Sequence, residues 1–174
     1  MRIAYQGGPG AFSHEACLAF APGWEPVAHP TFEGVVEAVA AGATERGILP
    51  IKNRYAGPVP GVEPLLGRIA RIEEHELAVR LHLLALPGAR LEEIEAVVSH
   101  PMAIAQCAET LAALGLRSEE AANTALAAEA LDSRAKGVLA SEAAASAYGL
   151  QILKRDMHDR PDNATRFAIF EALR

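Results

Sequence analysis

The sequence has few cysteines, no long apolar run and no metal-ligand pattern. Cys17 and Cys107 are its two cysteines, and no CxxC pair occurs. Neither a zinc site nor a disulfide framework is therefore indicated, and a reduced, cytoplasmic setting fits best. The start MRIAYQGGPG reaches glycine before an apolar signal segment can develop, and no apolar run approaches the length of a membrane span. These features argue against secretion and against insertion into a membrane.

An excess of positive charge is also lacking. The 174 residues carry 16 Lys and Arg against 22 Asp and Glu, a formal net charge of -6. A nucleic-acid-binding protein normally has a concentrated basic face, so nucleic acid is not expected as a partner. An anionic small molecule would have to be bound by a few local cations.

The histidines form neither an HxxxH nor an HxH pair, which argues against a metal site. The sequence contains no GxSxG element and no P-loop. We therefore expect no metal and no cofactor whose binding depends on such motifs.

The chain does have the content of a folded α/β protein. Hydrophobic residues make up 51% of it, enough for a real core. Strand-like runs such as RIAYQ, EPVAH and RGILPI alternate with helical patterns, one of which starts near Thr31. This alternation predicts an α/β fold with mixed, mostly parallel sheets.

The second half repeats the alternation. A strand in IEAVVSH leads into one helix from Pro101 to Gly115, and Asn123 or Thr124 caps the next helix. NATRFAIFEA forms a final strand. The extended segment at 75–87 and the final strand would connect two lobes, and a cleft between the lobes is the expected ligand site.

Polar residues follow or precede several predicted strands. In GGPGAFSHEA, Ser13 and backbone amides could face an anion at a helix start, although a simple tight turn explains the stretch better. In SHPMAIAQC, Ser99 is explained better as a helix cap, and Gln106 as a solvated or satisfied side chain. Each stretch alone is a weak signal.

The last strand begins with Thr165 and Arg166. An arginine suits a carboxylate because its planar fork donates two parallel hydrogen bonds, and a threonine hydroxyl can donate one proton. Successive side chains of a strand point to opposite faces, so both residues need not reach one substrate group. A surface arginine on an edge strand is the simpler alternative.

Together these stretches resemble the prephenate dehydratase family, which includes the plant-type arogenate dehydratases. The likeness extends from Ile3 to Phe170 in seven ordered motifs. AYQGGPGAFSHEA is similar to YxGPxGTFSHxA, LPIKNRYAGPV to PIENSxxGxV, SHPMAIAQC to SHPQALAQC, and NATRF to NxTRF. LLALPG, NTALAA and LASEAAASAYGL match further family segments. Chance similarity over this many ordered motifs is not credible.

The resemblance implies two α/β lobes of type II periplasmic-binding-protein type, with lobe 1 at about 1–76 plus 158–174 and lobe 2 at about 77–157. It implies loss of carbon dioxide and the ring hydroxyl from prephenate, giving phenylpyruvate for phenylalanine biosynthesis, without metal or cofactor. A homodimer or homotetramer is expected. The sequence printed here stops soon after NATRF, so we expect no ACT regulatory domain within it.

Family motifs also suggest the site residues. Thr165 would donate a proton or hydrogen bond to the leaving hydroxyl. Asn53, Ser99 and Gln106 would act beside it, and Arg166, Thr124 and Ser13 would bind the substrate. Turnover requires that the hydroxyl be helped to leave while the departing carboxylate is not held too tightly.

The chain departs from the family at PIKNRYAGPV, where Lys52 and Arg54 stand in place of Glu and Ser, and Pro58 in place of a Ser or Thr. The added positive charge could tighten binding of the substrate dianion, or hold its ring carboxylate and slow the reaction. We expect an active enzyme with Lys52 and Arg54 near the substrate. The alternatives are an arogenate dehydratase, a prephenate decarboxylase-like enzyme, a decayed enzyme with a regulatory role, and a non-catalytic binding protein for a carboxylated small molecule.

Overall fold

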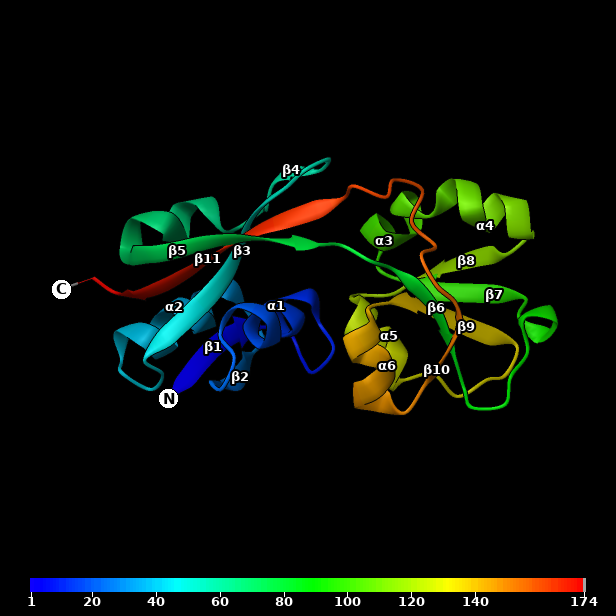
Figure 1. The fold of residues 1–174 in the computed structure, drawn as a ribbon, viewed down its shortest axis with the longest axis horizontal. Coiled ribbons are helices and arrows are strands. Elements are labelled where there is room, and N and C mark those ends of the chain that lie inside the picture. The colour runs from blue at the N-terminus through cyan, green and yellow to red at the C-terminus, as the bar shows by residue number, and fades with distance from the viewer. Residues whose placement is uncertain (174) are drawn as a thin grey trace. The chain divides into compact units, whose positions relative to one another are not determined.

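The computed structural model describes residues 1–173 and divides the chain into two compact units. Unit 1 comprises residues 1–79 and the C-terminal segment that starts at Asn163, and unit 2 comprises Arg80–Asp162. The chain therefore passes from one unit to the other twice (Figure 1). The boundaries lie a few residues later in the chain than those expected from the sequence.

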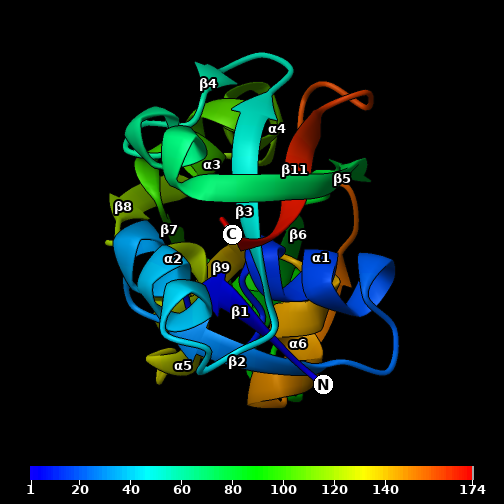
Figure 2. The same ribbon diagram turned by 90° about the vertical axis from the view of Figure 1, so that its left-hand side faces the viewer.

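Unit 1 contains one mixed sheet, sheet A, in the order β2-β1-β3-β11-β5, with β4 paired to β3. Its strands are β1 (Arg2–Gln6), β2 (Glu25–His29), β3 (Arg46–Asn53), β4 (Gly57–Pro58), β5 (Ile69–Ala78) and β11 (Ala164–Ala172). β1 pairs in parallel with β2 and β3, whereas β11 runs antiparallel to both β3 and β5. The last strand of the chain is thus inserted beside β3 (Figure 2).

Two helices pack on opposite faces of sheet A. Residues of α1 (Phe12–Phe20) share a buried cluster with Phe167 and Ile169, and residues of α2 (Phe32–Ala40) share another with Leu49 and Phe170. Successive side chains of a strand point to opposite faces, so Phe167 and Ile169 of β11 reach the α1 side of the sheet and Phe170 reaches the α2 side. The expected start of α2 is confirmed, because the Thr31 hydroxyl accepts a hydrogen bond from Gly34 N at 3.0 Å.

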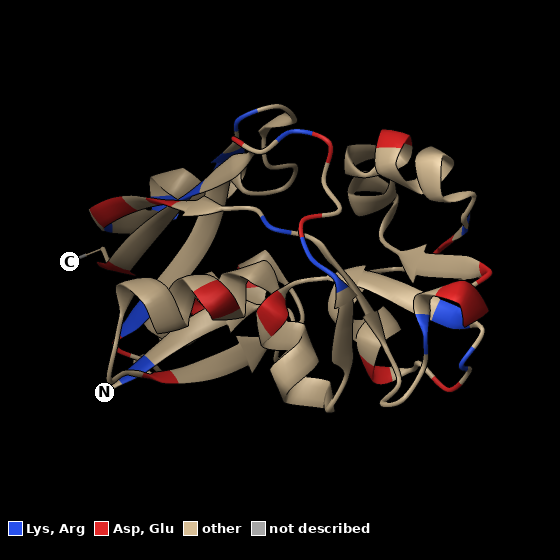
Figure 3. Ribbon diagram, turned by 45° about the vertical axis from the view of Figure 1, so that its right-hand side comes forward, with Lys and Arg blue, Asp and Glu red and all other residues tan. Residues whose placement is uncertain are grey.

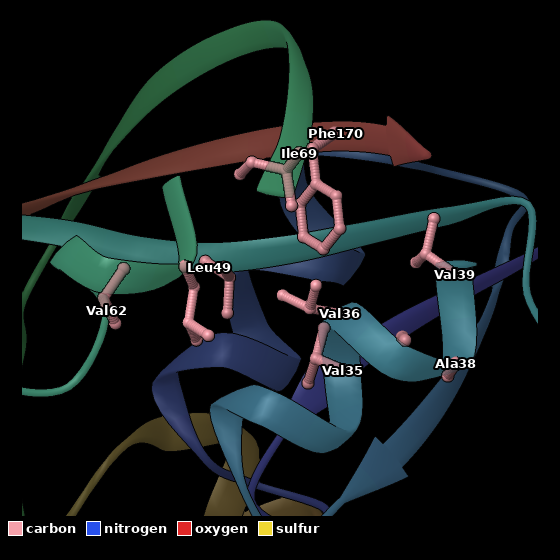
Figure 4. Close-up of a cluster of buried hydrophobic side chains, with 10 residues drawn as sticks. Val35, Val36, Ala38, Val39, Leu49, Val62, Ile69 and Phe170 are labelled. Atoms are coloured by element: carbon pink, nitrogen blue, oxygen red, sulfur yellow. The ribbon is translucent and has the colours of Figure 1, made fainter. Parts of the chain in front are cut away.

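The cluster under α2 is closely packed around the Phe170 ring, which points toward Val36 and Ile69 (Figure 4). Gly47 on β3 lies against this ring in register with Phe170. A Cβ added at Gly47 would lie 2.3 Å from Phe170 Cζ. The absence of a side chain at this position therefore makes room for the aromatic ring.

Unit 2 contains sheet B in the order β10-β6-β9-β7-β8. Its strands are β6 (His82–Ala85), β7 (Ala96–Ser99), β8 (Arg117–Glu120), β9 (Lys136–Ala140) and β10 (Gln151–Lys154). β7 pairs in parallel with β8 and β9, and β6 pairs antiparallel with β9 and β10. β8 and β10 are absent from the strands that the sequence pattern identified. Both are short, and β8 is exposed at every residue, so neither has the buried alternation that marks a strand.

The helices of unit 2 are α3 (Pro101–Gln106), α4 (Ala108–Leu114), α5 (Thr124–Glu129) and α6 (Glu142–Tyr148). Pro101 is the first residue of α3, as predicted, and Asn123 rather than Thr124 caps α5 through a 2.7 Å hydrogen bond from Leu126 N. The 3-10 segments are Glu63–Arg68 in unit 1 and Leu91–Glu93 in unit 2.

The prediction of one continuous helix from Pro101 to Gly115 is wrong. The helix breaks at Cys107, and Asp159 binds both ends of the break. Asp159 N donates to Gln106 O at 2.8 Å, while the Asp159 carboxylate accepts hydrogen bonds from Glu109 N and Thr110 N at 3.0 Å each. A residue distant in sequence thus satisfies backbone groups that the break exposes.

The α/β fold with mixed sheets is confirmed. Parallel pairs do not predominate, however: among the described residues the nine strand pairings comprise four parallel and five antiparallel ones. The antiparallel pairs all involve β4, β5, β6, β10 or β11, which include the strands next to the two crossings between units. No helix in residues 1–173 is both long and apolar enough to cross a membrane.

Candidate functional site

Thr165 and Asn53 meet where β11 begins and β3 ends. The antiparallel register pairs the two residues directly, and Asn53 Nδ2 donates to Thr165 Oγ1 at 3.0 Å. Thr165 is partly buried and the Asn53 side chain belongs to the buried polar residues of unit 1. The sheet therefore brings together a hydroxyl and an amide that the family resemblance assigns to catalysis.

Backbone amides fix the orientation of the Asn53 amide group. Asn53 Oδ1 accepts hydrogen bonds from Tyr55 N at 3.0 Å and from Ala56 N at 2.9 Å. Because a backbone N–H can only donate, the oxygen of the amide must face this turn and the nitrogen must face β11. The same nitrogen lies 3.0 Å from Asn163 Oδ1 and 3.2 Å from the Ala164 carbonyl oxygen.

This arrangement determines what the Thr165 hydroxyl can do. Its oxygen accepts a hydrogen bond from Asn53, so its own proton is not needed for that contact. A hydroxyl has one proton to donate, and here it remains available for another acceptor. The pair Asn53 and Thr165 is thus arranged as a hydrogen-bond donor for a ligand oxygen.

Ser13 lies in the first turn of α1 and is 6% exposed. Nearby, His14 Nδ1 accepts a hydrogen bond from Gly10 N at 3.1 Å and its ring stacks on Tyr5 with centroids 5.2 Å apart. Burial lowers the pKa of His14, which favours the neutral ring that this acceptor role needs. The glycine loop is therefore held against the end of β1.

Ser13 lies on the same side of sheet A as Thr165. Leu77, which pairs with Thr165 across the sheet, packs in the cluster formed by α1. Cross-strand partners share a face, so Thr165, Asn53 and Leu77 are on the α1 face. No recorded hydrogen bond in residues 1–173 joins Ser13 to the Asn53 and Thr165 pair.

Arg166, Lys52 and Arg54 lie together, but on the other face. Arg166 pairs in register with Lys52 and with Glu76, one position along from the Thr165 pairings. An open pocket of about 210 Å³ is lined by Lys52, Arg54, Glu76, Ala164 and Arg166, and Thr165 is not among its lining residues. Figure 3 shows both signs of charge along this part of unit 1. Their role as substrate contacts stays a prediction.

Three predicted residues belong to unit 2. Ser99 is completely buried and its hydroxyl donates to the Leu139 carbonyl at 2.7 Å, so its proton bonds β7 to the neighbouring β9. Gln106, at the end of α3, and Thr124, the first residue of α5, are half-buried. Roles for these three in a reaction stay predictions, as does the expected cleft between lobes.

The suggestion that Ser99 caps the following helix is wrong. Ser99 is the last residue of β7, and the side chain of His100 caps α3 through a 3.1 Å hydrogen bond from Met102 N to Nδ1. The Ser99 side chain instead satisfies a buried carbonyl group of the sheet.

Sequence reasoning placed Asn163 at the start of the last strand without giving it a role, and it missed Glu76 as a neighbour of the candidate site. Asn163 is 3% exposed and accepts from Asn53 Nδ2, and Glu76 lies between two arginines. The first position of NATRF was a signal for Asn163. Nothing in the sequence indicated Glu76, because its place depends on the register of β5 with β11.

The fold defines a two-unit α/β protein with one mixed sheet in each unit. Likeness to three lipoproteins, one of them a putative methionine-binding protein, has TM-scores of 0.52 to 0.53 at 10 to 13% identity. Similarity at this level shows the fold alone. The sequence model described as prephenate dehydratase matches residues 3–173, and the chain belongs to the prephenate dehydratase family.

Known relatives agree with this assignment. Arogenate dehydratase/prephenate dehydratase 1, chloroplastic, of Arabidopsis thaliana is 38% identical over 174 residues, which cover 97% of this chain and 44% of the plant protein. The structure of GqqA, described as a novel type of quorum quenching acylase, has a TM-score of 0.93 at 35% identity and is covered to 65%, with all of this chain matched.

The structure of prephenate dehydratase in complex with L-Phe from Arthrobacter aurescens has a TM-score of 0.91 at 23% identity, with 100% of this chain and 61% of that one covered. The chain thus spans less than half the length of the plant relative described above and under two thirds of both solved structures.

Proposed function

We propose that the protein is a prephenate dehydratase. It would convert prephenate to phenylpyruvate, carbon dioxide and water in the biosynthesis of phenylalanine. The observation that carries the proposal is the 3.0 Å hydrogen bond from Asn53 Nδ2 to Thr165 Oγ1, which leaves the threonine proton available. Membership of the prephenate dehydratase family supports the choice of substrate.

The chemistry needs little more than an oriented substrate and a proton donor. The bond between the ring carbon and the ring carboxylate breaks, and its electron pair completes the aromatic ring as the hydroxyl leaves. The hydroxyl departs more easily when it receives a proton or a strong hydrogen bond. Thr165 would give that hydrogen bond, and Asn53 would hold the threonine oxygen in position.

The buried environment of the pair supports this role. Asn53 is 9% exposed and Asn163 is 3% exposed, so water competes little for the donors and acceptors around Thr165. A fixed, partly dehydrated hydrogen-bond donor is more effective than one that must reorganise during the reaction. Ser13, on the same face of sheet A, is proposed to bind the substrate, and Ser99, Gln106 and Thr124 of unit 2 are proposed to contribute.

Arogenate is the second candidate substrate, because the plant relatives are named for it. It differs from prephenate in having an amine where prephenate has a side-chain keto group. The residues that pair with Thr165 across the sheet, Asn53 and Leu77, carry no charge that would select the amine. We therefore rank prephenate first and treat arogenate as the direct comparison.

The test is turnover by the purified protein, with phenylpyruvate measured from prephenate and phenylalanine measured from arogenate. Thr165→Val and Thr165→Ser serve as a matched pair, since the first removes the hydroxyl and the second keeps it. Product that is lost in Thr165→Val and kept in Thr165→Ser supports the proposal. A folded protein that binds prephenate without product would favour the binding-protein alternative.

An acylase assay belongs beside this test because the structurally similar GqqA is described as a quorum quenching acylase. A relative from Komagataeibacter europaeus is named a bifunctional N-acyl-homoserine lactone acylase/prephenate dehydratase, and an acylase needs a nucleophile to attack the amide bond of its substrate. Burial raises the pKa of both Cys17 and Cys107 to about 12, with Asp159 adding to the rise at Cys107. These thiols stay protonated near neutral pH and would not serve as thiolate nucleophiles. We expect no cysteine-dependent cleavage of the acyl amide bond.

Assembly and location are part of the proposal. We expect two or four copies of the chain to associate in the cytoplasm of the cell. Light scattering after size-exclusion chromatography measures the assembly directly, and a monomer at assay concentrations would contradict it. Fractionation of cells that express the untagged protein tests the location.

A further inference from the structure

We propose that Lys52, Arg54 and Arg166 form a binding site for a small dianion, such as a phosphate or a dicarboxylate, distinct from the Asn53 and Thr165 pair. The site lies on the face of sheet A opposite to that pair. It gives the two cations that distinguish this chain from its family pattern a function of their own. Its existence does not depend on the proposed reaction.

The pocket has the position and size of a small-anion site. It is open, has a volume of about 210 Å³, and is lined by residues from the ends of β3, β5 and β11 and from the turn after β3. Lys52, Arg166 and Glu76 lie side by side because the register pairs Arg166 with both of the others. Two separate stretches of chain thus bring their cations to one place, beside Glu76 from a third.

The lining of the pocket contains three cations and one carboxylate. Glu76 is shared: its Oε2 lies 3.3 Å from Arg54 Nη2 and its Oε1 lies 3.7 Å from Arg166 Nη2. Glu74 lies 3.9 Å from Arg166 Nη1.

The existing ion pairs are weak enough to yield to a ligand. The side chains of Arg54, Arg166 and Glu76 are 44%, 49% and 50% exposed. Exposed pairs at these distances contribute between zero and about 1 kcal/mol each. Within residues 1–173, no ion pair is recorded for Lys52. An oxyanion with two negative charges can therefore bind to Lys52 and to the forks of both arginines while Glu76 turns away.

The site is separated from Thr165 by the sheet itself. Thr165 and Arg166 are consecutive on a strand, so their side chains point to opposite faces. One backbone hydrogen bond joins the chain near both sites: Arg54 N donates to the carbonyl oxygen of Ala164, the residue before Thr165, at 2.9 Å. A ligand in the pocket would contact Arg166 without contacting the Thr165 hydroxyl. This differs from the expectation, based on the sequence, that the three cations bind the substrate.

The experiment titrates inorganic phosphate and, separately, malonate into ¹⁵N-labelled protein at constant ionic strength, and follows backbone and arginine side-chain resonances. We expect saturable shifts centred on Lys52, Arg54 and Arg166 with both anions, and no saturable shift with chloride. A preference for phosphate over malonate, or the reverse, identifies which source of the dianion the site takes.

Matched variants test the assignment. Arg54→Ser and Lys52→Glu, which introduce the residues of the family pattern, are expected to raise Kd on the order of tenfold or more, since each removes a charged hydrogen-bond donor. Arg117→Ser and Arg117→Glu make the same charge changes at an exposed residue of unit 2 that pairs with Glu95 at 3.7 Å. They are expected to leave Kd unchanged.

The proposal is overturned if no saturable binding occurs, or if the Arg117 variants weaken it as much as the Arg54 and Lys52 variants. Competition between prephenate and phosphate for the same resonances would also overturn it, because the cations would then belong to the substrate site. If the protein bound phosphate but formed no product from prephenate, the proposed function would be refuted and the anion site would stand.

Discussion

Asn53 Nδ2 and Thr165 Oγ1 lie 3.0 Å apart although 112 positions separate them in the chain. The contact exists because the C-terminal strand β11 inserts beside β3 in antiparallel register. The same register holds Arg166 against Lys52 on the opposite face. One strand pairing therefore creates two chemically different sites, a neutral hydrogen-bonding pair on one face and a cationic pocket on the other.

Replacing Thr165 with valine should abolish most of the proposed turnover without unfolding the protein. Valine has nearly the shape of threonine and suits a strand, and Asn53 Nδ2 keeps Asn163 Oδ1 and the Ala164 carbonyl as acceptors. We expect kcat for prephenate to fall by about 10²- to 10⁴-fold, the usual contribution of a positioned proton donor. Steady-state assays of phenylpyruvate formation and a thermal melt check both parts.

Thr165→Ser is the matched control, since it keeps the hydroxyl and loses one methyl group. Its kcat should stay within about tenfold of the wild-type value, because rotational freedom of the serine weakens the alignment only partly. Equal loss of activity in the valine and serine variants would show that the shape of the side chain matters rather than its proton, and would contradict the proposed role.

Replacing Asn53 with aspartate should be more damaging than the small change in side-chain shape suggests. The oxygen that replaces Nδ2 would face three acceptors, Asn163 Oδ1, the Ala164 carbonyl and Thr165 Oγ1, with one hydroxyl proton to satisfy them. We expect the free energy of unfolding to fall by about 3 kcal/mol, typical of a charge left with wrong partners. The threonine proton would turn toward the new carboxylate, so kcat should fall as well.

Asn123→Asp is the control for this change. At the start of α5, Asn123 Oδ1 accepts a hydrogen bond from Leu126 N at 2.7 Å. An aspartate oxygen can accept the same bond, and aspartate caps helices equally well. Urea denaturation should show little change for Asn123→Asp. If Asn53→Asp were as stable as the wild type, the assigned orientation of the Asn53 amide would be wrong.

Replacing Gly47 with alanine should destabilise unit 1 by overpacking. The added Cβ would lie 2.3 Å and 2.6 Å from Phe170 Cζ and Cε1, so the ring would have to move within a closely packed cluster. Such strain typically costs 1 to 3 kcal/mol, so we expect a loss of about 2 kcal/mol in the free energy of unfolding. Chemical denaturation of the purified variant measures it.

Gly67→Ala makes the same change where an added Cβ would have no heavy atom within 4 Å. Its stability should stay within about 0.5 kcal/mol of the wild type. Phe170→Leu should make the Gly47→Ala change less costly, because the smaller side chain leaves room for the methyl group. Purely additive losses in the double variant would show that the ring is not what the methyl group meets.

Local rules were enough to predict some of these features from the sequence. Thr31 and Asn123 cap their helices because capping depends on a side chain and the next three residues. The opposite orientations of Thr165 and Arg166 follow from strand alternation. The motifs likewise indicated Thr165 and Asn53 through their likeness to the family.

Features that depend on distant partners could not be predicted. Ser99 was a candidate for substrate contact, yet its proton binds the Leu139 carbonyl, which depends on how β7 pairs with β9. The break at Cys107 depends on Asp159, some 50 positions later. The place of Lys52 depends on the register of β3 with β11. For Ser99 and Lys52 the sequence identified the residue but not its neighbour, and for Cys107 it did not indicate the break.

His82 should make the stability of the protein depend on pH in the weakly acidic range. It is 2% exposed, and its Nδ1 accepts a hydrogen bond from Asp156 N at 3.0 Å, which only the unprotonated nitrogen can do. Burial lowers the pKa of His82 from its ordinary value of 6.5, although the negative charge of Asp156 opposes the shift. The other contributing charges are Arg155, Glu142 and His158.

Because the folded protein holds His82 at a pKa below 6.5, the unfolded chain takes up the proton first as the pH falls. The stabilising contribution is therefore complete above about pH 6.5 and is lost as the pH falls from there toward the folded pKa, at up to about 1.4 kcal/mol per pH unit. His14, whose pKa burial also lowers, adds a dependence of the same sign. Urea denaturation at pH 7.5 and pH 5.5 should show the difference.

His82→Asn separates the two histidines. The Asn side-chain oxygen can take the place of Nδ1 as acceptor for Asp156 N but does not titrate in this range. The variant should lose part of the pH dependence and keep the remainder, which His14 contributes through its contact with Gly10 N. If the free energy of unfolding changed equally with pH in the wild type and in His82→Asn, proton uptake at His82 would not be the cause.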